Sequence, residues 1–275
     1  VMKAAGVTKG QKALVFLTCG PDLIATVFAL FKMGVLPVML DPGMGKDNVR
    51  RCIEHVQPDV FIGIRLAHLM RWLYRKSFAS VKFNFTANEW FPGCIELAKE
   101  APKYTEPFPV TPVGEHEIAA ILFTSGSTGK AKGVVYTHSI FQNQVKYLRE
   151  LFDFKPGELD MPGYPLFALF DIALGMTSVI PRLDPSKPAA CDPALLVETM
   201  EEYNVTTCQG SPAIWRKVYN YCKDESIKLD TLKRLITFGA PIPTELLQGM
   251  FTIMAEGAEI YTPYGATESL PVAII

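Results

Sequence analysis

The sequence predicts an α/β protein in which parallel β-sheets are covered by helices. Short apolar runs rich in β-branched residues alternate with longer helical patterns through most of the chain, as in successive β-α-β units. The 275 residues suffice for one large or two modest domains. Hydrophobic residues make up 49% of the chain and charged residues 20%. This composition excludes an intrinsically disordered protein and supplies a large core.

The first α/β region is expected near the start of the chain. Its elements are a strand at residues 13–17, a helix at 21–33, a strand at 35–40, a helix at 46–56 and a strand at 60–64. Pro21 suits the first helical turn, because its missing N–H would have no partner inside the helix there.

A second region of the same style is expected further along the chain. Its elements are strands at residues 205–209, 235–238 and 259–261, with helices at 213–221 and 244–254. Residues 77–114 are rich in Pro, Asn, Thr and aromatic residues without a clean period, which indicates a connector. We therefore expect residues 1–76 and 115–275 to form two α/β subdomains of one larger domain.

Residues 66–76 predict a helix that is apolar on one face and basic on the other. Leu66, Leu69 and Leu73 share one face, while arginine and lysine residues follow on the rest of the helix. The favoured interpretation is an ordinary helix with its apolar face on the core and its basic face in solvent. The alternative is a helix that rests on a membrane surface.

Charge and cysteine usage give no general reason for a macromolecular partner. The formal net charge is −1, so no nucleic-acid partner is expected. The six cysteines form no C-x-x-C pair, which is typical of free thiols in a reducing compartment, and we expect a cytoplasmic protein.

The longest apolar stretches are interrupted by charged, Gly or Pro residues, so no integral membrane segment is predicted. The oligomeric state is left open.

The most informative segment is residues 118–137, IAAILFTSGSTGKAKGVVYT. An apolar strand is followed by a run of Ser, Thr, Gly, Lys and Ala and then by a second strand. Glycines let the backbone approach a ligand, successive N–H groups bind anions, and hydroxyl groups and two lysines add donors and charge. The loop is therefore predicted to bind polyphosphate. A Walker A loop is excluded, because Ala131 and Val134 occupy the positions where its second glycine is required.

Residues 123–133, FTSGSTGKAKG, resemble the signature phosphate loop of the AMP-forming adenylating enzymes, which include acyl-CoA synthetases, luciferases and peptide-synthetase adenylation domains. Residues 261–268, YTPYGATE, are similar to the Y-G-x-T-E motif of that family. Between these motifs, TFGAPIP at 237–243 resembles the adenine-contacting turn, and TTCQGSP at 206–212 resembles the segment that lines the acyl pocket. The resemblance covers essentially the whole chain and implies the large N-terminal region of such an enzyme.

The resemblance implies a set of nucleotide contacts and two cofactors, ATP and Mg²⁺. The phosphate loop would contact ATP through Thr124, Ser125, Gly126, Ser127, Thr128, Gly129 and Lys132. The adenosine would be bound by Gly239, Ala240, Pro241, Tyr264 and Gly265. Thr267 would donate to the α-phosphate, and Glu268 would bind Mg²⁺. Lys132, Thr267 and Glu268 are the residues expected to act in catalysis.

The acyl pocket is the weaker part of the prediction. Phe167, Gly210 and Ser211 are its candidate lining residues, and Phe170 and Met176 are equally well explained as plain core. Many acyl-CoA synthetases have a histidine where this chain has Ala168. The family's C-terminal domain with its catalytic lysine has no counterpart here, so we expect part of a longer enzyme that binds nucleotide better than it turns it over.

Within the family, VIPRLDPSKPA at 179–189 and TPYGATESLP at 262–271 look most like enzymes of olefin biosynthesis that close 3-hydroxy fatty acids to β-lactones. The expected substrate is a fatty-acid-like carboxylate, and coenzyme A is the alternative acceptor.

Two other classes of function stay open. One is a non-catalytic nucleotide- or acyl-binding module. The other is an NAD-dependent oxidoreductase, because DPGMG at 41–45 follows a strand and precedes a helix.

Overall fold

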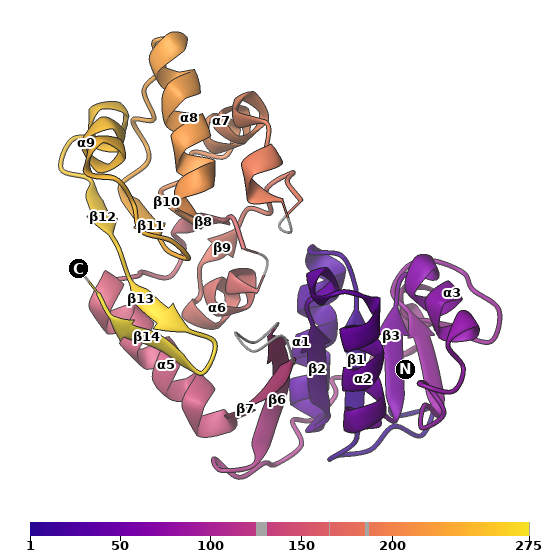
Figure 1. The fold of residues 1–275 in the computed structure, drawn as a ribbon. Coiled ribbons are helices and arrows are strands. Elements are labelled where there is room, and N and C mark those ends of the chain that lie inside the picture. The colour runs from indigo at the N-terminus through magenta and orange to yellow at the C-terminus, as the bar shows by residue number, and fades with distance from the viewer. Residues whose placement is uncertain (125–130, 165, 185–186, 275) are drawn as a thin grey trace. The chain divides into compact units, whose positions relative to one another are not determined.

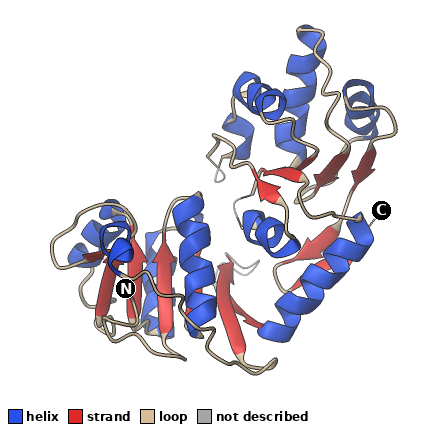
Figure 2. Cartoon of the chain, turned by 180° about the vertical axis from the view of Figure 1, so that it is seen from behind, coloured by secondary structure: helices blue, strands red, loops and turns tan. Residues whose placement is uncertain are grey.

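The computed structural model describes residues 1–124, 131–164, 166–184 and 187–274. The chain forms two compact units, Val1–Asn143 and Gln144–Ile275 (Figure 1). In each unit helices flank a β-sheet (Figure 2). The predicted α/β class with parallel sheets covered by helices is confirmed. Among the described residues, no helix combines the length and apolar composition that crossing a bilayer requires.

The sheet of the first unit has the strand order β5-β4-β3-β1-β2-β6-β7. Its strands are β1 (Lys12–Phe16), β2 (Leu36–Leu40), β3 (Val60–Gly63), β4 (Phe83–Thr86), β5 (Ile95–Glu96), β6 (Ile118–Thr124) and β7 (Lys132–Thr137). Every pair is parallel except β6 with β7, which is antiparallel. The helical segments are α1 (Pro21–Met33), η1 (Pro42–Met44), α2 (Lys46–Val56), α3 (Arg65–Leu73), α4 (Leu97–Glu100) and η2 (Ala101–Lys103).

Helix α1 begins and ends where the sequence predicts. Pro21 occupies the first turn, and Gly34 ends the helix in the left-handed conformation with φ 65°. Its N–H donates to the carbonyl oxygens of Leu30 and Phe31, which would otherwise lack intrahelical partners.

The core of the first unit lies between the sheet and its helices. Leu14, Val38 and Phe61 from three adjacent strands belong to one buried cluster with Val49 and Ile53 of α2. These apolar side chains attach α2 to the sheet.

Residues 77–114, expected as a connector, instead contribute β4 and β5 to the sheet. β4 pairs in parallel with β3, where Phe85 lies opposite Ile62. The two strands are four and two residues long, too short for a sequence period to reveal them. The boundary between the compact units lies between Asn143 and Gln144, within helix α5 (His138–Phe152).

The structure overturns the favoured interpretation of the helix predicted at residues 66–76. Helix α3 exposes Leu66, Leu69 and Leu73, while Ala67 and His68 are its buried residues. The apolar face is therefore on the solvent side. The sequence grouped Met70 with the three leucines, but Met70 packs against the core while the leucines face solvent, because a period alone does not say which face meets the core.

The second unit contains a parallel sheet in the order β12-β11-β10-β8-β9. Its strands are β8 (Leu159–Pro162), β9 (Thr177–Ser178), β10 (Thr207–Gly210), β11 (Arg234–Thr237) and β12 (Glu259–Tyr261). A hairpin follows, made of β13 (Tyr264–Ala266) and β14 (Ser269–Ala273). The helical segments, besides α5, are α6 (Phe167–Leu174), η3 (Pro188–Ala190), α7 (Pro193–Glu202), α8 (Pro212–Asp224) and α9 (Thr244–Ile253).

The core of the second unit is built around Trp215 of α8, which is fully buried. Cys208 and Leu235 of the sheet and Met250 of α9 belong to the same cluster. The edge strands of this sheet are short, with two residues in β9 and three in β12. The hairpin is tied to α5 by a 3.1 Å hydrogen bond from Gln144 Nε2 to the Leu270 carbonyl oxygen.

Candidate functional site

Three neighbouring strands of the second unit end at one edge of the sheet. In the parallel pairs, Gly210 of β10 lies opposite Thr237 of β11, and Ile236 of β11 lies opposite Tyr261 of β12. The segments that follow these strands therefore leave the sheet side by side. Ligands of open α/β sheets bind at this carboxyl edge. The predicted acyl segment includes β10 and ends just after it, and the predicted adenine turn and the Y-G-x-T-E motif follow β11 and β12.

The predicted adenosine contacts are open to solvent. Gly239 has φ 88°, a conformation that L side chains rarely adopt, and a Cβ there would meet nothing within 4 Å. Ala240 and Pro241 after it are exposed. The Tyr264 side chain on β13 is 71% exposed, so a face of its ring is available to a purine.

The end of the Y-G-x-T-E motif lies in the β13–β14 hairpin. Gly265 belongs to β13 and packs so closely that a Cβ would lie 2.6 Å from Cδ2 of Leu270. Thr267 is half-buried and Glu268 is exposed in the turn that follows. The hairpin thus presents the Glu268 carboxylate to solvent.

The predicted acyl-pocket residues are brought together in the same unit. The Phe167 ring lies 4.9 Å from that of Phe238, which follows β11. The Phe238 N–H donates to the Gly210 carbonyl oxygen at 3.0 Å. Phe167, Gly210 and the segment after β11 therefore form one continuous part of the sheet edge. Ala168, at the position where many acyl-CoA synthetases have a histidine, is fully buried.

Ser211 lies at the start of α8, where its Oγ is buried. Neither this hydroxyl nor Nε1 of the buried Trp215 has a hydrogen-bond partner within the described part of the chain. Buried polar atoms are nearly always paired in folded proteins. The two unpaired atoms therefore mark the start of α8 as a place where a ligand or water completes the structure.

Gly210 is required by packing. A Cβ at this position would lie 2.9 Å from Cζ2 of Trp215, so we expect Gly210→Ala to lower the free energy of unfolding by about 2 kcal/mol through overpacking. Urea denaturation measures this change. Gly114→Ala is the control, because its Cβ would lie 3.4 Å from Glu117 Oε1, an ordinary contact. Equal stability of the two variants would contradict the prediction.

The ends of the predicted phosphate loop belong to the first unit. Thr124 ends β6 and lies opposite Lys132, the first residue of β7. Lys132 is exposed. Ser125, Gly126, Ser127, Thr128 and Gly129 lie outside the described residues. The two predicted strands are present and pair in antiparallel fashion.

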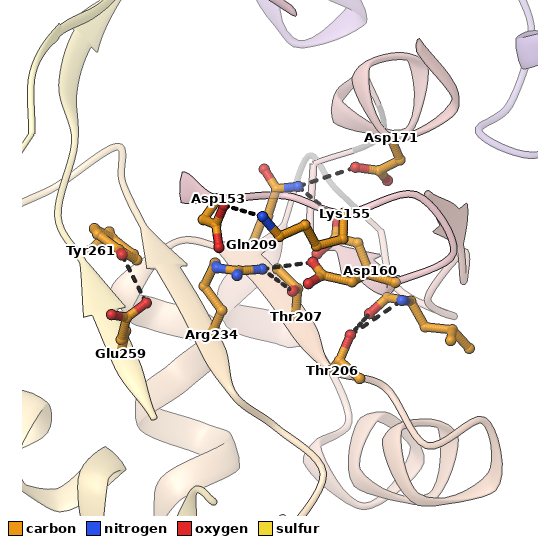
Figure 3. Close-up of polar contacts among 12 residues, drawn as sticks. Asp153, Lys155, Asp160, Asp171, Thr206, Thr207, Gln209, Arg234, Glu259 and Tyr261 are labelled. Atoms are coloured by element: carbon orange, nitrogen blue, oxygen red, sulfur yellow. Dashed lines mark hydrogen bonds and ion pairs between the residues drawn. The ribbon is translucent and has the colours of Figure 1, made fainter. Parts of the chain in front are cut away.

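A buried polar cluster that the sequence analysis missed lies in the second unit (Figure 3). Gln209 Nε2 donates to Asp160 Oδ2 at 2.6 Å and to Asp171 Oδ1 at 3.3 Å. Ser178 Oγ donates to Asp171 Oδ2 at 2.7 Å. Both carboxyl groups are fully buried. Burial raises the pKa of Asp171 to about 6, and burial together with the charge of Asp171 raises the pKa of Asp160 well above its usual range.

An ion pair lies beside this cluster (Figure 3). Arg234 Nη1 donates to Glu158 Oε2 at 2.8 Å and to Thr207 Oγ1 at 3.1 Å. The guanidinium also lies over the Phe154 ring, 5.0 Å from its centroid. These contacts join the amino-terminal ends of β10 and β11 to Glu158, the residue before β8, at the edge of the sheet opposite the candidate site.

The donor set at the hairpin fits magnesium better than a transition metal. Among the described residues, no three His, Cys, Asp or Glu side chains gather as metal ligands. Mg²⁺ takes one or two carboxylates from a protein and completes its shell with phosphate oxygens and water. The single exposed carboxylate of Glu268 matches that requirement once a nucleotide is bound.

Comparisons with known proteins agree with these features. A family model described as "AMP-binding enzyme" matches residues 1–275. An olefin beta-lactone synthetase of Xanthomonas campestris pv. campestris is 40% identical over 271 residues, covering 98% of this chain and 48% of the relative. One of Stenotrophomonas maltophilia is 38% identical over 272 residues, with the same two shares. The chain thus spans about half the length of the curated relatives it matches.

The fold has known counterparts as well. The crystal structure of the N-terminal domain of FACL13 from Mycobacterium tuberculosis superposes with a TM-score of 0.83 and 19% sequence identity. The match covers 97% of this chain and 65% of that one. This likeness concerns the fold.

Proposed function

Because the chain belongs to the AMP-binding enzyme family, we propose that it forms the larger part of the site in which an enzyme activates a carboxylic acid as an acyl-adenylate. A carboxylate oxygen of the acid attacks the α-phosphorus of ATP. The bond from that phosphorus to the bridging oxygen breaks, and pyrophosphate leaves. The observation that carries this proposal is the family match over the whole chain, together with the predicted nucleotide motifs at adjacent strand ends.

In this proposal each motif has a separate task. The loop that starts at Thr124 binds the β- and γ-phosphates through its N–H and hydroxyl groups, and Lys132 offsets their charge. Gly239, Ala240, Pro241, Tyr264 and Gly265 bind the adenosine. Thr267 donates to the α-phosphate, where negative charge grows as the acid attacks. Mg²⁺, held by Glu268 and the phosphates, would neutralise the departing pyrophosphate.

The proposed acid is a long-chain fatty acid with a hydroxyl group at carbon 3. The two relatives named as olefin beta-lactone synthetases support this choice. In the lactone branch, the 3-hydroxyl oxygen of the adenylate attacks its own carbonyl carbon and releases its proton to solvent, a four-membered ring closes, and AMP leaves with the bonding electrons. The aromatic side chains around Phe167 supply apolar surface for the acyl chain.

Exchange of labelled pyrophosphate into ATP tests the activation step. We expect exchange that depends on both Mg²⁺ and a long-chain acid when this chain is assayed within its full natural polypeptide. Exchange reports adenylate formation alone and needs no acceptor. Absence of acid-dependent exchange would sink the proposal.

The acceptor is tested separately by product analysis. With a 3-hydroxy fatty acid, ATP and Mg²⁺, we expect a β-lactone in the absence of coenzyme A. A product that forms only when coenzyme A is added identifies thiol transfer instead. Either result leaves the activation step intact, because both acceptors attack the same adenylate.

A further inference from the structure

Helix α3 directs its three leucine side chains away from the first unit, while Met70 packs against the core. Leu66 and Leu73 are 70% and 73% exposed, and Leu69 is 46% exposed. Their spacing of three and four positions places them on one face. The opposite face buries Ala67 and His68. A surface helix of a globular protein usually has the reverse arrangement, because buried leucines attach it to the core.

Polar and aromatic contacts hold α3 in this orientation. His68 Nε2 lies 2.9 Å from the Phe85 carbonyl oxygen, and Arg71 Nε donates to His68 Nδ1 at 3.3 Å. The imidazole also stacks on Phe91, with ring centroids 5.2 Å apart. Burial lowers the pKa of His68, which favours the neutral ring that these two bonds require. Rolling the helix to bury its leucines would break all of these contacts.

The segment that carries the exposed leucines is basic, and the Glu89 carboxylate accepts a 2.9 Å hydrogen bond from the Arg65 N–H at its start. The stretch 65–76 contains three arginines and one lysine and no acidic residue. A hollow of about 200 Å³ lies at the C-terminal part of α3 and the turn after it. Its lining residues are Arg71, Trp72, Arg75 and Phe78. Guanidinium groups bind phosphate oxygens through paired N–H donors, so the hollow suits a phosphate group.

We propose that α3 and the turn after it, residues 65–78, form a docking surface for a membrane that contains anionic lipids. Leu66, Leu69 and Leu73 enter the boundary between headgroups and acyl chains, as the apolar face of an interfacial helix does. Trp72 lies at headgroup level, and Arg75 contacts a lipid phosphate. An apolar face bordered by basic residues and a tryptophan matches this occupant better than a protein partner. The proposal concerns the first unit and does not rest on the proposed catalytic activity.

Co-sedimentation with lipid vesicles tests the docking surface. We expect the chain to bind vesicles of phosphatidylcholine mixed with phosphatidylglycerol, and not vesicles of phosphatidylcholine alone. Binding should weaken with added salt, because salt screens the basic residues. The paired change Leu66→Ser and Leu73→Ser should weaken binding about tenfold or more. Its unfolding temperature should stay unchanged, because both side chains are largely exposed.

Matched variants show whether vesicle binding depends on this surface or on the charge and hydrophobicity of the chain as a whole. Val110→Ser, at a residue 69% exposed elsewhere in the unit, should leave vesicle binding unchanged. Arg75→Gln with Lys76→Gln should weaken binding, whereas Lys223→Gln with Lys228→Gln should not. Equal binding by the leucine variant and the unchanged chain would overturn the proposal. So would a leucine variant that turns a dimer into a monomer in size-exclusion chromatography, because a second copy would then cover the surface.

Discussion

Replacing Glu268 with glutamine is expected to slow acid-dependent exchange of pyrophosphate into ATP by about 10²- to 10³-fold. Glutamine keeps the size of the side chain but removes the negative charge that would hold Mg²⁺. Because the Glu268 side chain is exposed in the turn between β13 and β14, the substitution should leave the fold intact. The measurement is the exchange rate at several Mg²⁺ concentrations.

The control for this experiment is Glu256→Gln, an exposed carboxylate of the same unit that lies outside the motif. It should keep the full exchange rate. If Glu268→Gln instead exchanges as fast as the control at every Mg²⁺ concentration, Glu268 is not the metal ligand. A loss that high Mg²⁺ partly restores would support the assigned role, because mass action compensates for a weaker site.

The second large effect concerns the stability of the fold. Asp171→Asn is expected to raise the free energy of unfolding at alkaline pH. The pKa of Asp171 is raised from 3.8 to about 6 in the folded chain. Between these values the folded state binds more protons than the unfolded state, so the free energy of unfolding falls as pH rises through this window. The shift of about 2 pKa units corresponds to roughly 3 kcal/mol above pH 6. Asparagine does not ionise and should avoid that loss.

Urea denaturation at pH 4 and pH 8 measures this effect. The variant and the unchanged chain should have similar stability at acidic pH and diverge as pH rises. Asp224→Asn, at an exposed position of α8, should show no such divergence. A variant that is less stable than the unchanged chain at pH 8 would show that the ionised carboxylate contributes to folding. The assignment of a destabilising charge to Asp171 would then be wrong.

Much of the fold was predictable because its signals are local. The bounds of α1, α2 and β12 agree with the sequence prediction, because their apolar patterns and the residues that flank them are local signals. Gly210, Gly239 and Tyr264 could be predicted to lie at one edge of the sheet, because each is at or just after the carboxyl end of a parallel strand. The roles of these residues, and of Thr267 and Glu268, remain predictions.

What escaped prediction depends on contacts between distant parts of the chain. Asp160 and Asp171 meet through Gln209, far away in sequence, and only the alignment of β8 with β10 reveals their proximity. The outward leucines of α3 likewise depend on the partners of His68. The need for glycine at position 210 comes from Trp215, whose indole occupies the space where a side chain would lie.

The short edge strands described above have a consequence for solubility. An edge strand offers unpaired N–H and C=O groups that can recruit a strand of another molecule. β5 and β9 have two residues each, and β12 has three. Such strands leave room for only one or two intermolecular hydrogen bonds. At three sheet edges, therefore, the short strands limit strand-to-strand aggregation, and Glu96 in β5 and Glu259 in β12 add charge at two of them.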